Sequence, residues 1–306
     1  MKSVRYQLSK VSGLEVYRDG EFEVLGLSNS EINGDIITFA EDPKFFNEIL
    51  GNHNITSVIT KKEYVEYFVD SIQGIAISEK PRLAFFSLHN LLASDMEYAL
   101  ATEKTVIGEN CHISNLCYID PENVVIGNNV TIEEFVSIRG HCRIGDNTVI
   151  RSGCQIGGEG FEFKQNGDSF YNVTHCGSVV IGNNVIIWPN VTIHKAVYPW
   201  DTTYIGNNTN INSQVHIDHG AKIGKRSEIC AGAIISGRCK LSDFSFVGPG
   251  AILSNRVSIG TNSRVSLGSV VTKTVEDGKT VTGNFAIDHK LFMDRLRRVS
   301  DKEHCD

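Results

Sequence analysis

The chain has 306 residues and a formal net charge of −7, with 41% hydrophobic and 21% charged residues. Such a composition is ordinary for a globular protein and leaves room for one large domain or two smaller ones. The acidic balance gives no basic surplus for displacing counterions, which excludes nucleic acid as the main partner, although a locally basic cleft would still suit a phosphate-bearing ligand.

The N-terminal residues MKSVRYQLSKVSGL lack the apolar segment of a signal peptide, and no apolar run approaches the length that a bilayer requires. We therefore expect a cytoplasmic protein with no transmembrane segment. Its eight cysteines form no CxxC pair and no zinc-ligand grouping, which predicts reduced cysteines with a packing role.

Residues 1–100 alternate short apolar runs, such as TSVIT and GIAIS, with helix-like stretches, such as DPKFFNEILG and RLAFFSLHNLL. This alternation predicts a small N-terminal α/β domain. We expect the domain to cover the start of the segment that follows, with its last helix leading directly into that segment.

Residues 101–283 carry an aliphatic residue at every sixth position, with a few interruptions. A period of six matches neither an α-helix nor a long flat strand, and it predicts a three-sided solenoid in which each face is a short strand and each corner a turn. One aliphatic side chain per face would point inward. These positions are Ile107, Ile113, Ile119, Ile126, Ile132, Ile138, Ile144, Ile150, Ile156, Ile181, Ile187, Ile193, Ile205, Ile211, Ile217, Ile223, Ile229, Ile235, Leu241, Val247, Leu253, Ile259, Val265 and Val271.

A second period, three times as long as the first, supports three faces per coil. Gly127 and Gly145 are three hexads apart, as are Gly206 and Gly224, and each follows an inward position. Glycine and asparagine tolerate the positive φ of tight corners, and runs such as IGNN place them where corners belong. The inward positions predict eight coils and, at a spacing of about 4.8 Å, a prism roughly 38 Å tall.

Two interruptions predict loops that leave the prism at its corners. The first spans residues 157–180 and carries aromatic residues and His175, and the second spans residues 194–204 and contains Pro199 and Trp200. Loops on a rigid scaffold are common places for substrate contacts. Residues 284–306 predict a short amphipathic C-terminal helix with a polar tail.

Several of these segments together resemble the UDP-3-O-acylglucosamine N-acyltransferases of lipid A biosynthesis and related enzymes that acylate nucleotide-linked amino sugars. The segments are NGDIITFAEDPKFFNEIL (33–50), EKPRLAFFSLHNLL (79–92), IGGEGFEF (156–163) and INSQVHIDHGAKIG (211–224). The resemblance implies a fold that is mainly β: a left-handed parallel β-helix of hexapeptide repeats with a small N-terminal α/β domain and a short C-terminal helix.

The resemblance also implies catalytic roles for His219 and Gly237. His219 would be the base that takes a proton from the acceptor amine, and an imidazole titrates in a suitable range. Gly237, three hexads later, would offer its backbone N–H to the thioester carbonyl. Family members often have a polar residue after the catalytic histidine, whereas this chain has Gly220, so another residue must orient the imidazole.

Five further residues match ligand-binding positions of the family. Phe39 and Phe45 fall on the aromatic pair that sandwiches a uracil ring. His216, Asn212 and His175 fall on positions that line the sugar pocket. At 212 and 216 this chain departs from the lipid A enzymes, which leaves the particular sugar open.

The function that the resemblance implies is N-acyl transfer from a thioester donor to the amine of a UDP- or other nucleotide-linked amino sugar, for lipid A or surface polysaccharide synthesis. The donor would be acyl-CoA or acyl carrier protein, and both stay open because the tail is short, with only Arg295, Arg297 and Arg298 as a basic cluster. We expect a homotrimer with no permanently bound cofactor and no metal.

Two alternatives use the same solenoid. A zinc-dependent hydratase of the carbonic anhydrase type needs three imidazoles that converge between subunits, for which His194, His216 and His219 are available. A non-enzymatic trimeric assembly module would need no histidine coil and no insertions.

Overall fold

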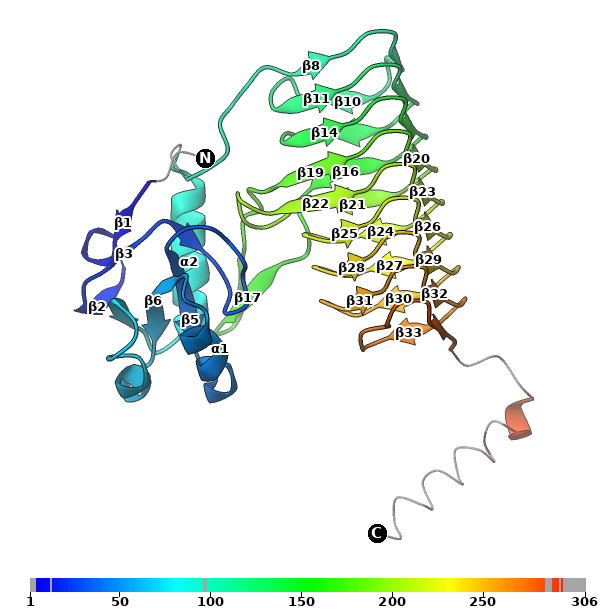
Figure 1. Cartoon of the computed structure of the whole chain (residues 1–306). Coiled ribbons are helices and arrows are strands. Elements are labelled where there is room, and N and C mark those ends of the chain that lie inside the picture. The colour runs from blue at the N-terminus through cyan, green and yellow to red at the C-terminus, as the bar shows by residue number, and fades with distance from the viewer. Residues whose placement is uncertain (1–3, 12, 96–97, 284–287, 292, 294–306) are drawn as a thin grey trace.

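The computed structural model describes residues 4–11, 13–95, 98–283, 288–291 and 293, and these form an α/β domain beside a long parallel β-helix (Figure 1). The boundaries at 100/101 and 283/284 stay a prediction. Most of the predicted C-terminal helix, including Arg295, Arg297 and Arg298, lies outside the described residues. None of the described helices has the length and apolar character that crossing a membrane requires.

The N-terminal domain is built on a five-stranded sheet in the order β2-β7-β6-β5-β4, in which only the β2–β7 pair is antiparallel. Its central strands are almost fully buried, as expected for near-continuous apolar runs. The elements are β1 (Tyr6–Gln7), η1 (Leu8–Lys10), β2 (Glu15–Arg18), β3 (Glu21–Phe22), β4 (Val24–Leu25), β5 (Ile36–Ala40), η2 (Pro43–Phe45), α1 (Phe46–Gly51), β6 (Ile55–Thr60), η3 (Lys62–Tyr67), β7 (Gly74–Ile77) and α2 (Pro81–Ala93).

The solenoid has three parallel sheets, one per face, and the inward residues stack in register. On the third face, for example, Ile193 pairs with Ile217 and Ile217 with Ile235. The first face contains β8 (Val106–Ile107), β11 (Val124–Ile126), β14 (Cys142–Ile144), β19 (Ser178–Ile181), β22 (Thr202–Ile205), β25 (Lys222–Ile223), β28 (Lys240–Leu241) and β31 (Ser258–Ile259).

The other two faces complete eight coils, as the repeat predicted, and β34 begins a ninth. The second face contains β9 (His112–Ile113), β12 (Thr131–Ile132), β15 (Val149–Ile150), β20 (Ile186–Ile187), β23 (Asn210–Ile211), β26 (Glu228–Ile229), β29 (Phe246–Val247), β32 (Arg264–Val265) and β34 (Thr280–Val281). The third contains β10 (Tyr118–Ile119), β13 (Ser137–Ile138), β16 (Gln155–Gly158), β21 (Thr192–His194), β24 (His216–Ile217), β27 (Ile234–Ile235), β30 (Ile252–Leu253) and β33 (Val270–Val271).

Glycine and asparagine occupy the corners for different reasons. In the run IGNN at 126–129, Asn129 takes the positive φ of 55°. Gly127 is required for a different reason, because a Cβ there would lie 2.4 Å from the Asp146 Oδ1 of the next coil. Close stacking of successive coils, rather than a left-handed backbone, therefore selects the glycine.

The two interruptions hold the N-terminal domain against the prism. The first contains a hairpin of β17 (Phe163–Asn166) and β18 (Ser169–Asn172). Apolar residues that follow the hairpin and residues of the second loop share one buried cluster with helix α2. Trp200 of the second loop stacks on Tyr198 with ring centroids 5.2 Å apart, and its indole N–H donates to the backbone O of Leu25 at 2.8 Å.

The prediction that the N-terminal domain covers the start of the solenoid is wrong. The domain lies beside the loops at mid-height, whereas β8 of the first coil lies at the far end of the prism (Figure 1). Val106 and Ile107 in the first coil are consequently 57% and 47% exposed. Apolar residues of the two loops are buried against α2, and this packing holds the domain there.

Truncating one inward isoleucine in the middle of the stack should be far more costly than truncating one in the first coil. Ile187 is fully buried and Ile107 is 47% exposed. We expect Ile187→Ala to lower the free energy of unfolding by about 2–5 kcal/mol and Ile107→Ala by less than about half of that. Urea denaturation followed by circular dichroism measures both, and equal losses would contradict the stacked-core description.

Candidate functional site

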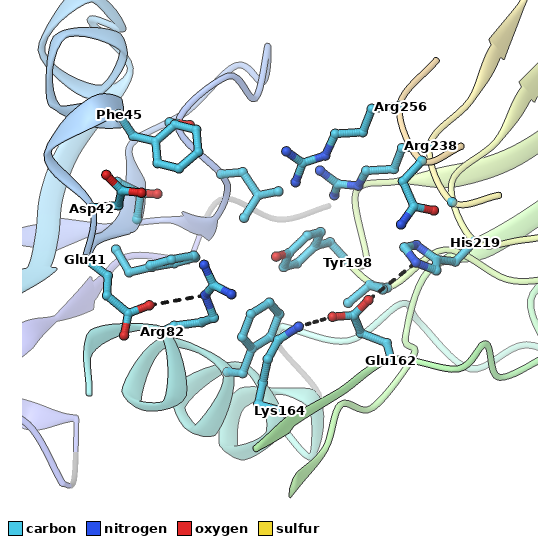
Figure 2. Close-up of a pocket in the computed structure, with 18 residues that line it drawn as sticks. Glu41, Asp42, Phe45, Arg82, Glu162, Lys164, Tyr198, His219, Arg238 and Arg256 are labelled. Atoms are coloured by element: carbon cyan, nitrogen blue, oxygen red, sulfur yellow. Dashed lines mark hydrogen bonds and ion pairs between the residues drawn. The ribbon is translucent and has the colours of Figure 1, made fainter. Parts of the chain in front are cut away.

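A cavity of about 240 Å³ lies between the N-terminal domain and the prism (Figure 2). Elements far apart in the sequence contribute to its wall: β5, η2 and α2 from the domain, the hairpin, the second loop and three successive corners of the prism. The lining residues are Leu27, Ser28, Thr38, Phe39, Glu41, Asp42, Phe45, Arg82, Phe86, Glu162, Lys164, Val197, Tyr198, His219, Gly237, Arg238, Asn255 and Arg256.

His219 stands at the corner that follows β24, and its side chain is only 13% exposed. The backbone N–H of His219 donates to Asp218 Oδ1 at 2.7 Å, which fixes the corner. Its Nδ1 is enclosed without a hydrogen-bond partner among the described residues, while Nε2 lies 3.5 Å from Glu162 Oε2. Nε2 is therefore the nitrogen that a ligand in the cavity can reach.

Gly237 lies directly over His219, since the Arg238 N–H donates to the His219 carbonyl at 2.9 Å. A Cβ on residue 237 would lie 2.7 Å from His219 Nε2, so only glycine leaves the imidazole in place. Within the described residues, the Gly237 N–H donates no hydrogen bond. This position thus offers a backbone donor beside the reachable nitrogen of His219.

Glu162 and Lys164 bring a charged pair from the hairpin to the imidazole. Glu162 Oε1 pairs with the Lys164 ammonium, and Glu162 Oε2 faces His219. Burial would raise the pKa of Glu162, but the neighbouring His219 and Lys164 side chains outweigh burial and lower the pKa to about 2. The carboxylate is therefore ionised at neutral pH and acts only as an acceptor.

The N-terminal domain contributes aromatic rings to the opposite side of the cavity. The Phe39 ring packs against Phe85 at 5.2 Å and lies 5.6 Å below the Arg82 guanidinium. Phe45 comes from η2, which Asp42 caps by accepting from the Lys44 N–H at 3.1 Å. Two flat rings are thus presented to one cavity, and flat rings suit stacking on a planar ligand.

Arginines make the upper wall of the cavity basic (Figure 2). Arg238 and Arg256 occupy equivalent corners one coil apart, with φ values of 59° and 65°. A left-handed backbone is unfavourable for arginine, and asparagine is the commonest non-glycine residue at the described left-handed corners. Arg238 lies 3.8 Å from Asp201, and Arg256 forms no ion pair with any described residue. An acidic protein thus has a cationic cavity wall.

The structure brings together four of the seven residues that the sequence suggested for the site. His219, Gly237, Phe39 and Phe45 all line the cavity, whereas the other three do not. His175 is fully buried, with its ring centroid 5.6 Å from that of His219. His216 lies outward on the third face, and Asn212 lies on another side of the prism beside Trp188 and Glu228. Sugar contact by these three residues stays a prediction.

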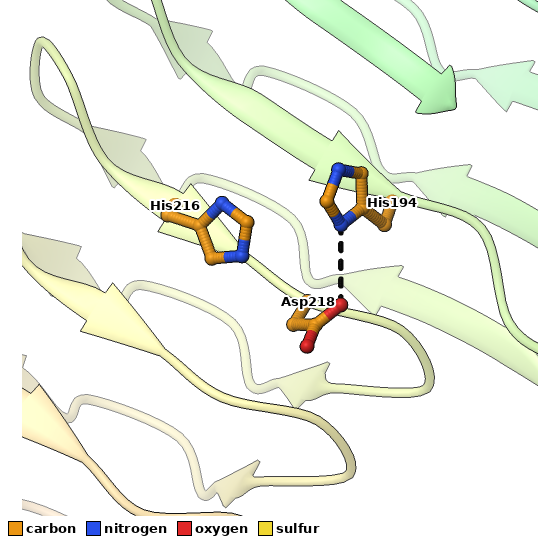
Figure 3. A group of neighbouring side chains, drawn as sticks. All are labelled: His194, His216 and Asp218. Atoms are coloured by element: carbon orange, nitrogen blue, oxygen red, sulfur yellow. Dashed lines mark hydrogen bonds and ion pairs between the residues drawn. The ribbon is translucent and has the colours of Figure 1, made fainter. Parts of the chain in front are cut away.

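His216 belongs to a second group of polar side chains, with His194 and Asp218 (Figure 3). Each offers one ligand atom, and these atoms lie within 4.8 Å of one another, so the group could supply two imidazoles and a carboxylate to a metal. His219 faces the cavity instead and is not part of this group. Asp218 Oδ1 already accepts from His194 Nδ1–H at 3.1 Å and from the His219 N–H at 2.7 Å, which explains its position without an ion.

The sequence reasoning missed the charged residues of the cavity. Arg238 and Arg256 could have been found, because the step of three hexads that places Gly237 over His219 also places residue 256 over residue 238. Glu162 and Lys164 lie in an insertion outside the repeat, so their position depends on how the hairpin folds back. Arg82 depends on the docking of α2, for which the sequence carries no signal.

The repeats match the family described as "Bacterial transferase hexapeptide (six repeats)" over residues 123–158 and 202–237. Among solved structures, the acyltransferase LpxA from Bacteroides fragilis superposes with a TM-score of 0.51 at 26% identity, covering 60% of this chain and 68% of that one. The UDP-N-acetylglucosamine acyltransferase from Campylobacter jejuni superposes with a TM-score of 0.52 at 23% identity, and the match covers 64% of this chain and 79% of that one. The predicted fold class, a left-handed parallel β-helix of hexapeptide repeats, is confirmed.

A more specific assignment follows from the sequence relatives. The UDP-3-O-acylglucosamine N-acyltransferase 2 of Legionella pneumophila (strain Paris) is 30% identical over 243 residues, which cover 71% of this chain and 69% of that protein. The chain belongs to the family of UDP-3-O-acylglucosamine N-acyltransferases. Other members match over shorter segments, such as the Hydrogenovibrio crunogenus protein, 34% identical over 110 residues that cover 34% of this chain and 31% of that protein. The first three relatives are matched over about a quarter to a third of their length.

Acidification should destabilise the fold through His175. Burial and then the neighbouring His219 charge lower the pKa of His175 to about 4, against an ordinary value of 6.5. Between these pH values the unfolded chain binds a proton that the folded chain excludes, so stability falls as pH falls from 6.5 to 4, by roughly 3 kcal/mol at most.

Urea denaturation at a series of pH values measures this effect. His175→Gln cannot titrate and should flatten the decline, while His112→Gln, which changes an exposed histidine of the first coil, should keep the wild-type slope. Identical slopes in the wild type and His175→Gln would contradict the assignment.

Proposed function

We propose that this protein transfers an acyl group from a thioester donor to the amine of a nucleotide-linked amino sugar. One observation carries the proposal: a single cavity is lined by two sets of groups, His219 with the Gly237 N–H, and the two phenylalanines of the N-terminal domain with the basic wall of Arg238 and Arg256. The first pair suits acyl transfer, and the second set suits a nucleotide diphosphate. Membership of the N-acyltransferase family supports the same reaction.

His219 and Gly237 divide the chemistry of the transfer. The amine nitrogen attacks the thioester carbon while His219 Nε2 takes one of its protons, and the Gly237 N–H stabilises the negative charge on the carbonyl oxygen. The C–S bond then breaks, and the imidazolium returns the proton to the departing thiolate. The overlay of residue 237 on residue 219 puts both groups beside the point where the amine nitrogen meets the thioester carbonyl.

The nucleotide end would bind toward the N-terminal domain. Phe39 and Phe45 can hold a flat base by stacking, and uracil is the base expected from the family name. Arg238 and Arg256 can donate charge-assisted hydrogen bonds to a diphosphate. Lys164 and Arg82 are already paired with Glu162 and Glu41, which leaves Arg256 as a basic group with no described acidic partner.

We also propose a homotrimer. Ile234, Ile252 and Val270 form an outward column on the third face, one coil apart, and are 38%, 39% and 66% exposed. Apolar columns of this kind are suited to packing against another copy. His216 stands next in the same column, above Ile234, so the group of His216, His194 and Asp218 would face the neighbouring chain.

Several finer points stay proposals. His216, Asn212 and His175 would contact the sugar only if a neighbouring chain completes the pocket around them. The donor is either acyl-CoA or acyl carrier protein, and product mass spectrometry with each donor separates them. A cytoplasmic location stays a prediction, as does a role in lipid A or surface polysaccharide synthesis.

Removing the imidazole should abolish most of the activity without loss of structure. We expect His219→Ala to lower kcat by about 10²–10⁴-fold, because the amine then has no positioned base. Mass spectrometry of the products formed from a UDP-linked amino sugar with acetyl-CoA or acyl carrier protein measures the rate. His112→Ala serves as a matched control on the first coil, and size-exclusion chromatography checks assembly. Wild-type activity in His219→Ala would refute the mechanism.

Binding of the nucleotide should depend on Arg256. We expect Arg256→Ala to raise the Kd for UDP by about 10- to 100-fold, which is the usual loss of affinity when a charge-assisted hydrogen bond is removed. Arg226→Ala is the matched control, since Arg226 also occupies a left-handed corner, at φ 55°, but does not line the cavity. Isothermal titration calorimetry measures both, and equal effects would place the diphosphate elsewhere.

A further inference from the structure

Glu162 is an acidic group placed at the reacting end of the cavity. The other two carboxylates that line it, Glu41 and Asp42, belong to the N-terminal domain and lie on the opposite side (Figure 2). Glu162 is 23% exposed, and Lys164 holds its Oε1 so that Oε2 points toward His219. General base catalysis by His219 does not by itself require a carboxylate at Nε2.

We infer, on the basis of the proposed function, that Glu162 binds the acceptor amine and makes the site select an amine over a hydroxyl group. One N–H of the amine would donate to Glu162 Oε2 and the other to His219 Nε2. A primary amine has two N–H bonds and satisfies both acceptors, whereas a hydroxyl has a single O–H and leaves one acceptor unpaired. Leaving a buried acceptor unpaired is what produces strong discrimination between substrates.

The distances in the free protein leave this contact open to a ligand. Oε2 and Nε2 are 3.5 Å apart, which is longer than a normal N–H···O hydrogen bond of about 2.7–3.2 Å. A weak contact of this length can widen to admit a nitrogen atom between the two acceptors. Lys164 keeps Glu162 on the hairpin side while this happens, because it holds the other carboxylate oxygen.

This role of Glu162 does not change which bonds form and break in the transfer or where the proton goes. The new C–N bond forms, one N–H proton passes to His219 Nε2, the C–S bond breaks and the thiolate receives that proton. Glu162 stays ionised throughout and retains the second N–H. Glu162 is thus a substrate-binding residue that also aims the nitrogen lone pair at the thioester carbon.

A different role for Glu162 would be to act through His219 alone, by stabilising the imidazolium. That role would affect amine and hydroxyl acceptors equally, since both must lose a proton to the same base. The ratio between the two acceptors therefore separates the two roles, and it can be measured by binding as well as by turnover.

The experiment compares UDP-glucosamine, which carries a free amine, with UDP-glucose, which carries a hydroxyl at the same carbon. We expect the wild type to bind UDP-glucosamine at least about 10-fold more tightly in calorimetry, and Glu162→Gln to reduce that preference to less than about threefold. The matched control is Asp168→Asn, which removes one charge from the exposed tip of the same hairpin and should keep the wild-type preference. Circular dichroism checks that each variant is folded.

Two results in the binding experiment would overturn the inference: equal affinity of the wild type for both nucleotides, or a preference that survives in Glu162→Gln. Failure of the proposed function has a different signature, in which the amine preference is seen in binding but no acylated product forms with any thioester. In turnover, kcat/KM for the amine should fall about 100-fold in Glu162→Gln while that for the hydroxyl changes little. A parallel fall of kcat/KM for both acceptors would show that Glu162 acts only through His219, and it too would overturn the inference.

Discussion

The register between successive coils is the constraint on which the rest of this protein depends. Each inward aliphatic residue stacks on its equivalent in the next coil, and the parallel hydrogen bonds allow no slip, because a shift of one residue would turn the buried side chains outward. Because the strands are held in register, the corner residues of successive coils are also aligned. Residues 219, 237 and 255 consequently form one line, and so do residues 238 and 256. The pairing of an imidazole with a backbone N–H, to which we assign catalysis, is thus a consequence of core stacking.

The prism alone gives only one wall of the site, and the insertions supply the remainder. The hairpin and the second loop bury aromatic residues against α2, which draws the N-terminal domain to mid-height, away from the open first coil. The same packing brings Phe45 and Arg82 across from His219 and places the Glu162–Lys164 pair beside it. The cavity therefore forms only when the N-terminal domain is packed against the loops.

Two carboxylates flank His219, and the structure gives them different tasks. Asp218 points to the third face, where it accepts from His194 and from the backbone of His219 itself. Glu162 approaches from the cavity and faces Nε2. Burial alone would raise the pKa of both, but hydrogen bonds from neighbouring donors outweigh it and lower each pKa to about 2, so both remain ionised. One anchors the corner, and the other is available to a ligand.

The sequence by itself determined the β-helix, the eight coils and the overlay of Gly237 on His219, because a rigid repeat converts spacing along the chain into position in space. It also identified Phe39 and Phe45 through the resemblance, and both line the cavity. Only the tertiary structure decided that Glu162, Lys164 and Arg82 join them and that Asn212 lies elsewhere. Those positions depend on how an insertion folds and where a helix docks, which are long-range packing events without a period in the sequence.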